Sequence, residues 1–302
     1  DDKRIKILEG VIESVEKNSA SHSGDQVLNL DLLRLLTRLY IVQTSYGNDV
    51  SGTHRKRAEE IQERVYKLMD HVSQGVRRKN DTVNLLAIRN DFNSVYAINL
   101  MLQNKMDKAL EITNDIENTS AKLLKLEPNS EPAVIQGSKA IELRGSILVE
   151  NNKAQDAIPL FDKSIDSLSK MLRSKLSTEP SKPMHTKLKN PKNELYMFLF
   201  LDSATIEKGK ALASMKKYDE AEQTLQSAIQ ISKNLQMVDG GASDGRNNEL
   251  TCYVQLHSIY LALNKIELAK KQIEQATELV SNNPEDSDLI EIFNEWVSKV
   301  GT

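Results

Sequence analysis

The sequence predicts an all-α fold made of repeated helix–turn–helix units. Residues 201–234 contain one complete unit, with Gly209 and Leu212 three residues apart on its first helix. A polar turn follows at Lys216 and Lys217. The second helix carries small or apolar residues at offsets of three and four: Tyr218, Ala221, Leu225 and Ala228. That period places them on one face of a helix.

The same pattern of a turn followed by an alanine occurs four times. The alanines are Ala109, Ala157, Ala221 and Ala269. The turns before them are predicted at residues 104–105, 151–152, 216–217 and 264. Gly145 and Gly209 occupy matching places in two of the first helices. Because glycine inside a helix costs roughly 1 kcal/mol relative to alanine, we expect each to lie mid-helix where another helix approaches closely.

Four helices are predicted before the first of these alanines. Residues 3–17 carry an apolar stripe, and residues 27–46 are apolar around more than half of the helix circumference. A helix of the second kind is typical of the centre of a core. Residues 54–79 form a long charged helix with one apolar side. Asp81 is then the predicted N-cap of a helix over residues 83–103.

The later breaks are marked by proline and glycine. Pro128 is expected to end the second helix of its unit at residue 126. Residues 174–190 contain two prolines and several lysines and are predicted to be a loop inserted between hairpins. Residues 239–245, DGGASDG, form a second break. The last helix, residues 286–300, is expected to cover the open end of the fold.

The order of glycine, leucine or aromatic residue, then alanine, bulky residue and alanine resembles the tetratricopeptide repeat (TPR) family. The resemblance implies an α-solenoid of about five stacked antiparallel helical hairpins, with an N-terminal helix and a C-terminal capping helix. Residues 1–302 would then form a single TPR-like domain. Because the chain begins at Asp1 without methionine, a fragment of a longer protein is also considered.

Composition and cysteine content narrow the class of protein. A net charge of -3 gives no argument for nucleic-acid binding, and one cysteine, Cys252, allows neither an intrachain disulfide nor a cysteine zinc cluster. An intracellular, cytoplasmic location is therefore expected, with the nucleus left open. No apolar run reaches the roughly 18 residues of a transmembrane helix, so membrane insertion is not expected.

The sequence offers no pattern that indicates catalysis. Its five histidines show no metal-ligand spacing, and no phosphate-binding loop or nucleophile elbow occurs. We therefore expect no catalytic residue, metal, cofactor or small-molecule substrate. His257 replaces the small packed residue of its unit and is expected to be a core histidine.

The resemblance implies a non-catalytic scaffold or adaptor subunit that binds a peptide or helical segment of a complex partner on its concave face. Carried over by offset, the expected partner-binding residues are Ile98, Met101, Glu142, Val149, Ile206, Lys210, Val254, Ser258 and Leu261. These positions are mostly apolar or small, so an apolar or amphipathic segment is favoured over a terminal carboxylate. Ordinary core packing explains the same residues equally well, because helical periodicity does not distinguish a groove from a core.

Basic clusters support an alternative, a helical subunit of a ribonucleoprotein that contacts RNA or an acidic partner. Residues 54–57 and 77–79 bracket one helix, and the candidate contacts Lys182, Lys187 and Lys189 lie in the inserted loop. No aromatic residue lies between Arg173 and Lys192 to stack on a base. Lysines in a loop are usually only solvated, so this is the weaker hypothesis.

Overall fold

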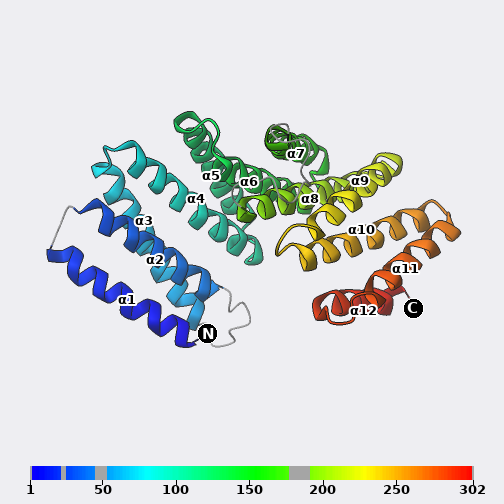
Figure 1. The fold of residues 1–302 in the computed structure, drawn as a ribbon, viewed down its shortest axis with the longest axis horizontal. Coiled ribbons are helices and arrows are strands. Elements are labelled where there is room, and N and C mark those ends of the chain that lie inside the picture. The colour runs from blue at the N-terminus through cyan, green and yellow to red at the C-terminus, as the bar shows by residue number, and fades with distance from the viewer. Residues whose placement is uncertain (1, 22–24, 45–52, 177–190, 301–302) are drawn as a thin grey trace. The chain divides into compact units, whose positions relative to one another are not determined.

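A computed structural model describes residues 2–21, 25–44, 53–176 and 191–300 (Figure 1). These residues form twelve helices and no strand, which confirms the predicted all-α class. The chain divides into two compact units, Asp1–Gln136 and Gly137–Thr302. The single domain expected for residues 1–302 stays a prediction.

The first unit begins with a single helix and continues with hairpins of antiparallel neighbours. Its helices are α1 (Asp2–Ser21), α2 (Gln26–Thr44), α3 (Thr53–Gly75), α4 (Lys79–Leu102) and α5 (Met106–Leu126). The helix α6 (Glu131–Glu150) starts in this unit and lies mostly in the second. Helices α2 and α3 form one hairpin and α4 and α5 form the next. The end of α5 at Leu126 confirms the stop predicted before Pro128.

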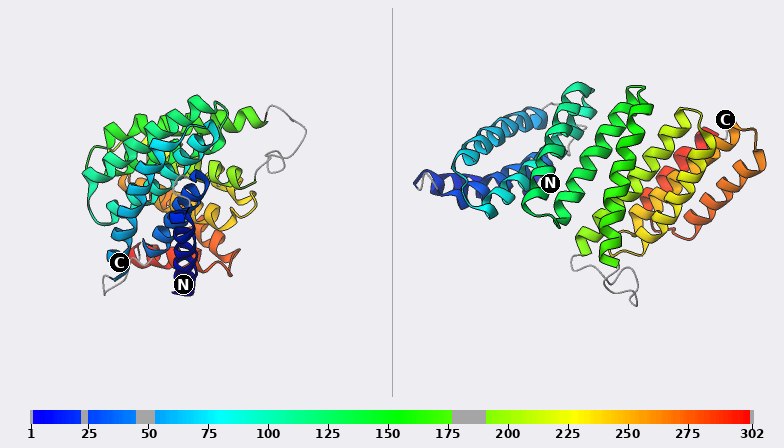
Figure 2. Two further views of the ribbon diagram at one scale, coloured as in Figure 1. Left: turned by 90° about the vertical axis from the view of Figure 1, so that its left-hand side faces the viewer. Right: turned by 90° about the horizontal axis from the view of Figure 1, so that it is seen from above.

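The second unit continues the same arrangement, and Figure 2 shows α8 to α11 side by side. Its remaining helices are α7 (Ala154–Leu176), α8 (Pro191–Ser214), α9 (Tyr218–Gln236), α10 (Ala242–Ala262), α11 (Ile266–Ser281) and α12 (Ser287–Val300). The described residues therefore contain five hairpins, one N-terminal helix and one C-terminal helix, as expected for this kind of solenoid.

Four hairpin turns share one backbone conformation. The left-handed residues are Asn104, Asn152, Lys216 and Asn264, with φ between 55 and 60°. In each turn this residue bonds its N–H to the carbonyl three residues earlier, and the lysine after it bonds to the carbonyl five residues earlier. These are the paired bonds of a Schellman motif, which satisfy the last carbonyls of the first helix. Asparagine tolerates this conformation better than most residues, which explains three of the four turns.

Several boundaries differ from the predicted ones. Helix α4 begins at Lys79, so Asp81 lies in its first turn, and Arg78 at the N-cap makes no side-chain capping bond. The charged helix ends at Gly75, before the predicted residue 79. Helix α7 continues through Leu176, so residues 174–176 of the predicted loop are helical. Residues 177–190 lie outside the described residues.

The glycine-rich break is shorter than predicted because α10 already begins at Ala242. Gly245 lies inside that helix, where an added Cβ would come within 2.7 Å of the Ser232 carbonyl oxygen in α9. Glycine is therefore required for close packing at this position. Gly240, with φ 78°, makes the turn itself.

The first helix of a hairpin approaches the second at Gly145 and at Gly209. A Cβ added to Gly145 would lie 2.6 Å from the Phe161 ring, and one added to Gly209 would lie 2.7 Å from Leu225 Cγ. Phe161 and Leu225 are both fully buried. The expectation that each glycine lies at a close helix–helix contact is confirmed.

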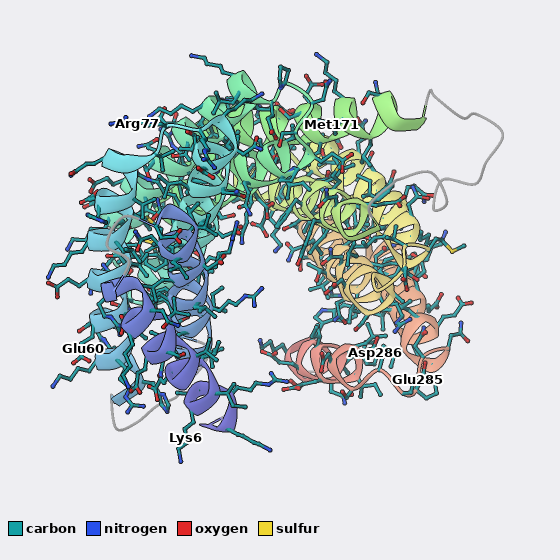
Figure 3. All side chains as sticks on the ribbon, turned by 60° about the vertical axis from the view of Figure 1, so that its left-hand side comes forward. Lys6, Glu60, Arg77, Met171, Glu285 and Asp286 are labelled. Carbon is teal, nitrogen blue, oxygen red and sulfur yellow. The ribbon has the colours of Figure 1, made fainter. Side chains whose placement is uncertain are left out.

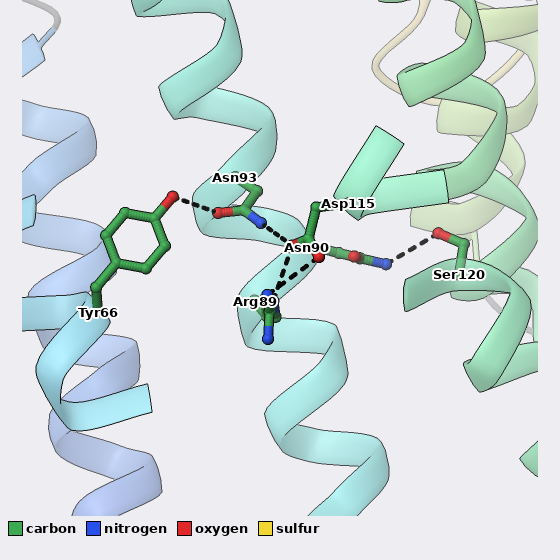
Figure 4. Close-up of polar contacts among 6 residues, drawn as sticks. All are labelled: Tyr66, Arg89, Asn90, Asn93, Asp115 and Ser120. Carbon is green, nitrogen blue, oxygen red and sulfur yellow. Dashed lines mark hydrogen bonds and ion pairs between the residues drawn. The ribbon is translucent and has the colours of Figure 1, made fainter. Parts of the chain in front are cut away.

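Polar contacts also join neighbouring helices, as Figure 4 shows for α3, α4 and α5. Arg89 and Asn93 of α4 both bind the Asp115 carboxylate of α5, at 2.8 and 2.7 Å. The Tyr66 hydroxyl of α3 donates to Asn93 Oδ1 at 3.1 Å. Such contacts fix how α4 is rotated between its neighbours, because an unpaired buried polar group is costly.

The C-terminal helix α12 covers α10 as a cap. Trp296, 8% exposed, meets the His257 ring edge-on with 5.4 Å between centroids. His257 is buried, which lowers its pKa, so the expected core histidine is confirmed. Asp286 lies at the turn before α12 (Figure 3), where it accepts from the Leu289 N–H at 3.3 Å and pairs with Arg246 at 2.7 Å.

A test of the close contacts replaces Gly209 with leucine and compares Gly10→Leu, since a Cβ at Gly10 meets nothing within 4 Å. We expect Gly209→Leu to lose about 1–3 kcal/mol of unfolding free energy through overpacking against Leu225. Gly10→Leu should keep or slightly raise stability, because leucine favours the helix. Urea denaturation measures both, and equal curves for the two variants would contradict the contact at Gly209.

Candidate functional site

The expected partner-binding residues come from the first helices of the hairpins. In the second unit they form three helical stripes, which together we term the first-helix face: Glu142 and Val149 on α6, Ile206 and Lys210 on α8, and Val254, Ser258 and Leu261 on α10. Each stripe uses offsets of three, four or seven residues, so its members lie along one side of their helix. Ile98 and Met101 belong to α4 in the first unit and are described separately.

Hydrogen bonds hold these three helices together. The Ser203 hydroxyl of α8 donates to Glu142 Oε1 of α6. Asn248 Nδ2 of α10 donates to Asp202 Oδ2 of α8 at 3.1 Å. The three helices are therefore fixed side by side within one unit, whichever of their residues contact a partner.

The first-helix face combines core and surface residues. Ile206 is 3% exposed and belongs to the core of the second unit, and half-buried Val254 packs against the same core. Leu261 is 47% exposed and Ser258 is also exposed. Of the two alternatives drawn from the sequence, core packing describes Ile206, whereas Leu261 is available to a partner. On α4, Ile98 is 38% exposed and Met101 is half-buried.

Glu142 is the most perturbed group of the face. Burial raises its pKa to about 8, and the neighbouring Glu207 carboxylate adds to the rise, against the Ser203 hydrogen bond and the charges of Lys139 and Lys210. Its Oε2 atom is shielded from solvent and has no hydrogen-bond partner. Lys210 pairs with Glu207 at 2.7 Å. A carboxyl group in this setting carries its proton near neutral pH.

Asp202 is a fully buried carboxyl group on the same side of α8 as Ile206 and Lys210. It accepts from Ser232 at 2.7 Å and from Asn248, both on Oδ2, and its Oδ1 atom has no partner. Burial raises its pKa to about 7 despite these two hydrogen bonds. No pattern in the sequence indicates this burial, because one aspartate inside a helix is usually exposed.

The remaining chemical groups are inert or paired. Burial raises the pKa of the Cys252 thiol well above its ordinary value, so it is a poor nucleophile. Among residues 2–21, 25–44, 53–176 and 191–300, no three His, Cys, Asp or Glu side chains come together as metal ligands. No helix in that part of the chain is long and apolar enough to cross a membrane.

The basic clusters are only partly described. Lys182, Lys187 and Lys189 lie outside the described residues. At the start of α3, Arg55 pairs with Glu59 at 3.6 Å and Arg57 pairs with Glu9 at 3.7 Å. Acidic neighbours therefore offset part of the positive charge at this end of the helix.

Comparison with known proteins supports the predicted family. The sequence model of the tetratricopeptide repeat matches residues 204–235 and 250–283, which are most of α8–α9 and α10–α11. The resemblance is confirmed for these two hairpins. Repeats of this family are generally non-enzymatic and suggest a protein-interaction scaffold. No curated protein matches the chain.

A solved structure resembles the whole fold. The crystal structure of BtubC (BKLC) from P. vanneervenii superposes with a TM-score of 0.62 over 94% of this chain and 92% of that one. The two sequences are 15% identical. This likeness supports the helical-repeat fold and carries no functional argument.

The buried carboxyl groups predict a pH dependence of stability. Because the folded pKa of Asp202 is raised from 3.8 to about 7, its contribution is full below pH 3.8 and is lost as pH rises toward 7. Asp202→Asn, which resembles the protonated form, should therefore gain stability relative to the parent over this range, by up to about 1.4 kcal/mol per pH unit. Urea denaturation at several pH values measures it. The exposed Asp244→Asn is the control, and parallel curves for both variants would contradict the expectation.

The first-helix face contains a core residue, Ile206, and a surface residue, Leu261, and replacing each with aspartate should change stability by different amounts. Ile206→Asp should destabilise the protein by about 3–5 kcal/mol, because it leaves an unpaired charge in the core. Leu261→Asp should change stability by less than about 0.5 kcal/mol, because Leu261 is on the surface. Thermal and urea unfolding measure both, and a large loss in Leu261→Asp would assign that residue to the core.

Proposed function

We propose that this chain with tetratricopeptide repeats is a non-catalytic scaffold or adaptor subunit, and that it binds a segment of a partner protein on the first-helix face of its second unit. The observation that carries the proposal is the position of that face. Two of its three helices, α8 and α10, are the first helices of the hairpins that match the repeat family, and α10 exposes Leu261 there.

The chemistry of the face favours an apolar or amphipathic segment. Val254, Ser258 and Leu261 form one stripe along two turns of α10, with one half-buried and one exposed apolar side chain. A partner side chain that covers Leu261 would remove apolar surface from water, which is the main source of affinity in such contacts. Ser258 is small enough to let a partner backbone approach.

Polar groups beside this stripe would orient the segment. Lys210 and Glu207, already paired with each other, add a charge of each sign. A segment with alternating apolar and polar residues would fit this arrangement better than a purely charged one.

The test is an affinity capture from the source cell followed by a binding measurement with the captured partner. Leu261→Asp and Ser258→Arg should each weaken binding at least about tenfold, because a charge or a large side chain enters the contact. The matched control is Met237→Asp, which changes an apolar side chain that is 67% exposed at the end of α9.

Melting curves distinguish a lost contact from a lost fold. All three variants should melt like the parent, since each changes an exposed residue. A partner that binds Leu261→Asp and Ser258→Arg as tightly as the parent would place its contact elsewhere and overturn the proposal.

A further inference from the structure

A cavity of about 580 Å³ opens in the first unit, between helices α2, α3 and α4. We refer to it as the α2–α4 cavity. It is lined among others by Tyr40, Gln43, Arg55, Ala58, Leu102 and Lys105. Its volume falls in the range of sites that enclose small organic ligands. It is independent of the first-helix face, which belongs to the second unit.

Gln43 lines this cavity and has a side-chain hydrogen-bond donor that is not used. The side chain is 1% exposed, and its Nε2 atom has no partner. Its Oε1 atom lies 2.7 Å from His54 Nδ1. Because an amide oxygen only accepts, the His54 nitrogen must donate, and this contact directs the amide NH₂ group away from His54. A buried donor without an acceptor is unfavourable, which is explained if a ligand supplies the acceptor.

Tyr40 supplies a second donor. Its hydroxyl oxygen accepts from Asn99 Nδ2 at 3.1 Å, which leaves the hydroxyl hydrogen for a ligand. Burial raises the pKa of Tyr40 to about 12, so the group stays protonated and keeps this hydrogen at neutral pH. Tyr40 and Gln43 are three residues apart on α2 and therefore lie on the same side of that helix.

The cavity lining carries more positive than negative charge. Arg55 and Lys105 are cations. Glu59, which pairs with Arg55 at 3.6 Å and whose charge also acts on Tyr40, is the one acid among the lining residues that the structure describes. Leu102, which is 80% exposed, supplies the apolar surface of the lining, whereas Ala58 and Leu100 are 4% and 2% exposed. The lining thus combines two neutral donors, a net positive charge and an apolar wall.

We propose that the α2–α4 cavity binds a small organic carboxylate that carries an apolar group. The two carboxylate oxygens accept from Gln43 Nε2 and the Tyr40 hydroxyl, and Arg55 and Lys105 offset the negative charge. The apolar group packs on Leu102. Inorganic phosphate would leave this wall uncovered, and a neutral amide would not use the two cations. The ligand is bound without reaction, so no catalytic group is required.

The test is calorimetric titration of the full chain with octanoate, below the concentration at which it forms micelles. The parent should bind it, and Gln43→Leu should weaken binding about tenfold or more, because it removes the buried donor. Gln74→Leu, which changes an exposed glutamine of α3, should bind like the parent. Gln43→Glu keeps the side-chain shape and should abolish binding by repulsion, so it replaces Gln43→Leu if that variant fails to fold.

Matched ligands and variants separate the contribution of charge to octanoate binding from that of the apolar group. Octanamide should bind at least about tenfold more weakly than octanoate, and Arg55→Gln should reduce octanoate binding while Arg77→Gln does not. Arg77 lies beyond the C-terminal end of α3 (Figure 3) and does not line the cavity. The proposal is overturned if the parent does not bind octanoate at millimolar concentration. It is equally overturned if Gln43→Leu and Gln43→Glu bind like the parent, or if octanamide binds as tightly as octanoate.

Discussion

The close approach of two helices within a hairpin is the constraint on which the rest of this structure depends. At Gly145 and Gly209 the partner helix places a fully buried Phe161 or Leu225 where a side chain would otherwise stand. The alanines after the turns serve the same packing from the second helix and are themselves buried. Small residues at these places let large ones interdigitate at native density. Helix length can then vary between hairpins, because the packing contact is fixed near the turn.

The turns and hairpins could be predicted because their signals are local. Asparagine or lysine followed by lysine indicates the left-handed residue of each turn. Apolar residues at helical spacing indicate each helix. The predicted boundaries were wrong where a local signal had a tertiary cause. Gly245 indicated a break, but its missing side chain serves the contact with α9. Asp81 has the chemistry of an N-cap, but the helix already starts at Lys79.

The candidate site was harder to predict because exposure depends on neighbouring helices. Ile206 and Leu261 both have groove-lining offsets, yet one is in the core and the other on the surface. No period in the sequence separates them, since α8 and α10 each contact several helices. The donor at Gln43 was also hidden, because it depends on a cavity assembled from three helices. Half-buried Glu142 and buried Asp202 show the same limit, as their hydrogen-bond partners lie on other helices.

The packing of α12 on α10 has a consequence for how unfolding of this protein can be observed. Trp296 is the only tryptophan in the sequence, and its indole is buried against His257 and Phe293. Detachment of α12 would bring the indole into water and shift its fluorescence emission to longer wavelength. The first unit contains no tryptophan and would not contribute to that signal. Tryptophan fluorescence, excited at a wavelength that tyrosine does not absorb, therefore reports the C-terminal cap, whereas circular dichroism reports all helices. A difference between the two transitions would measure how independently the cap opens.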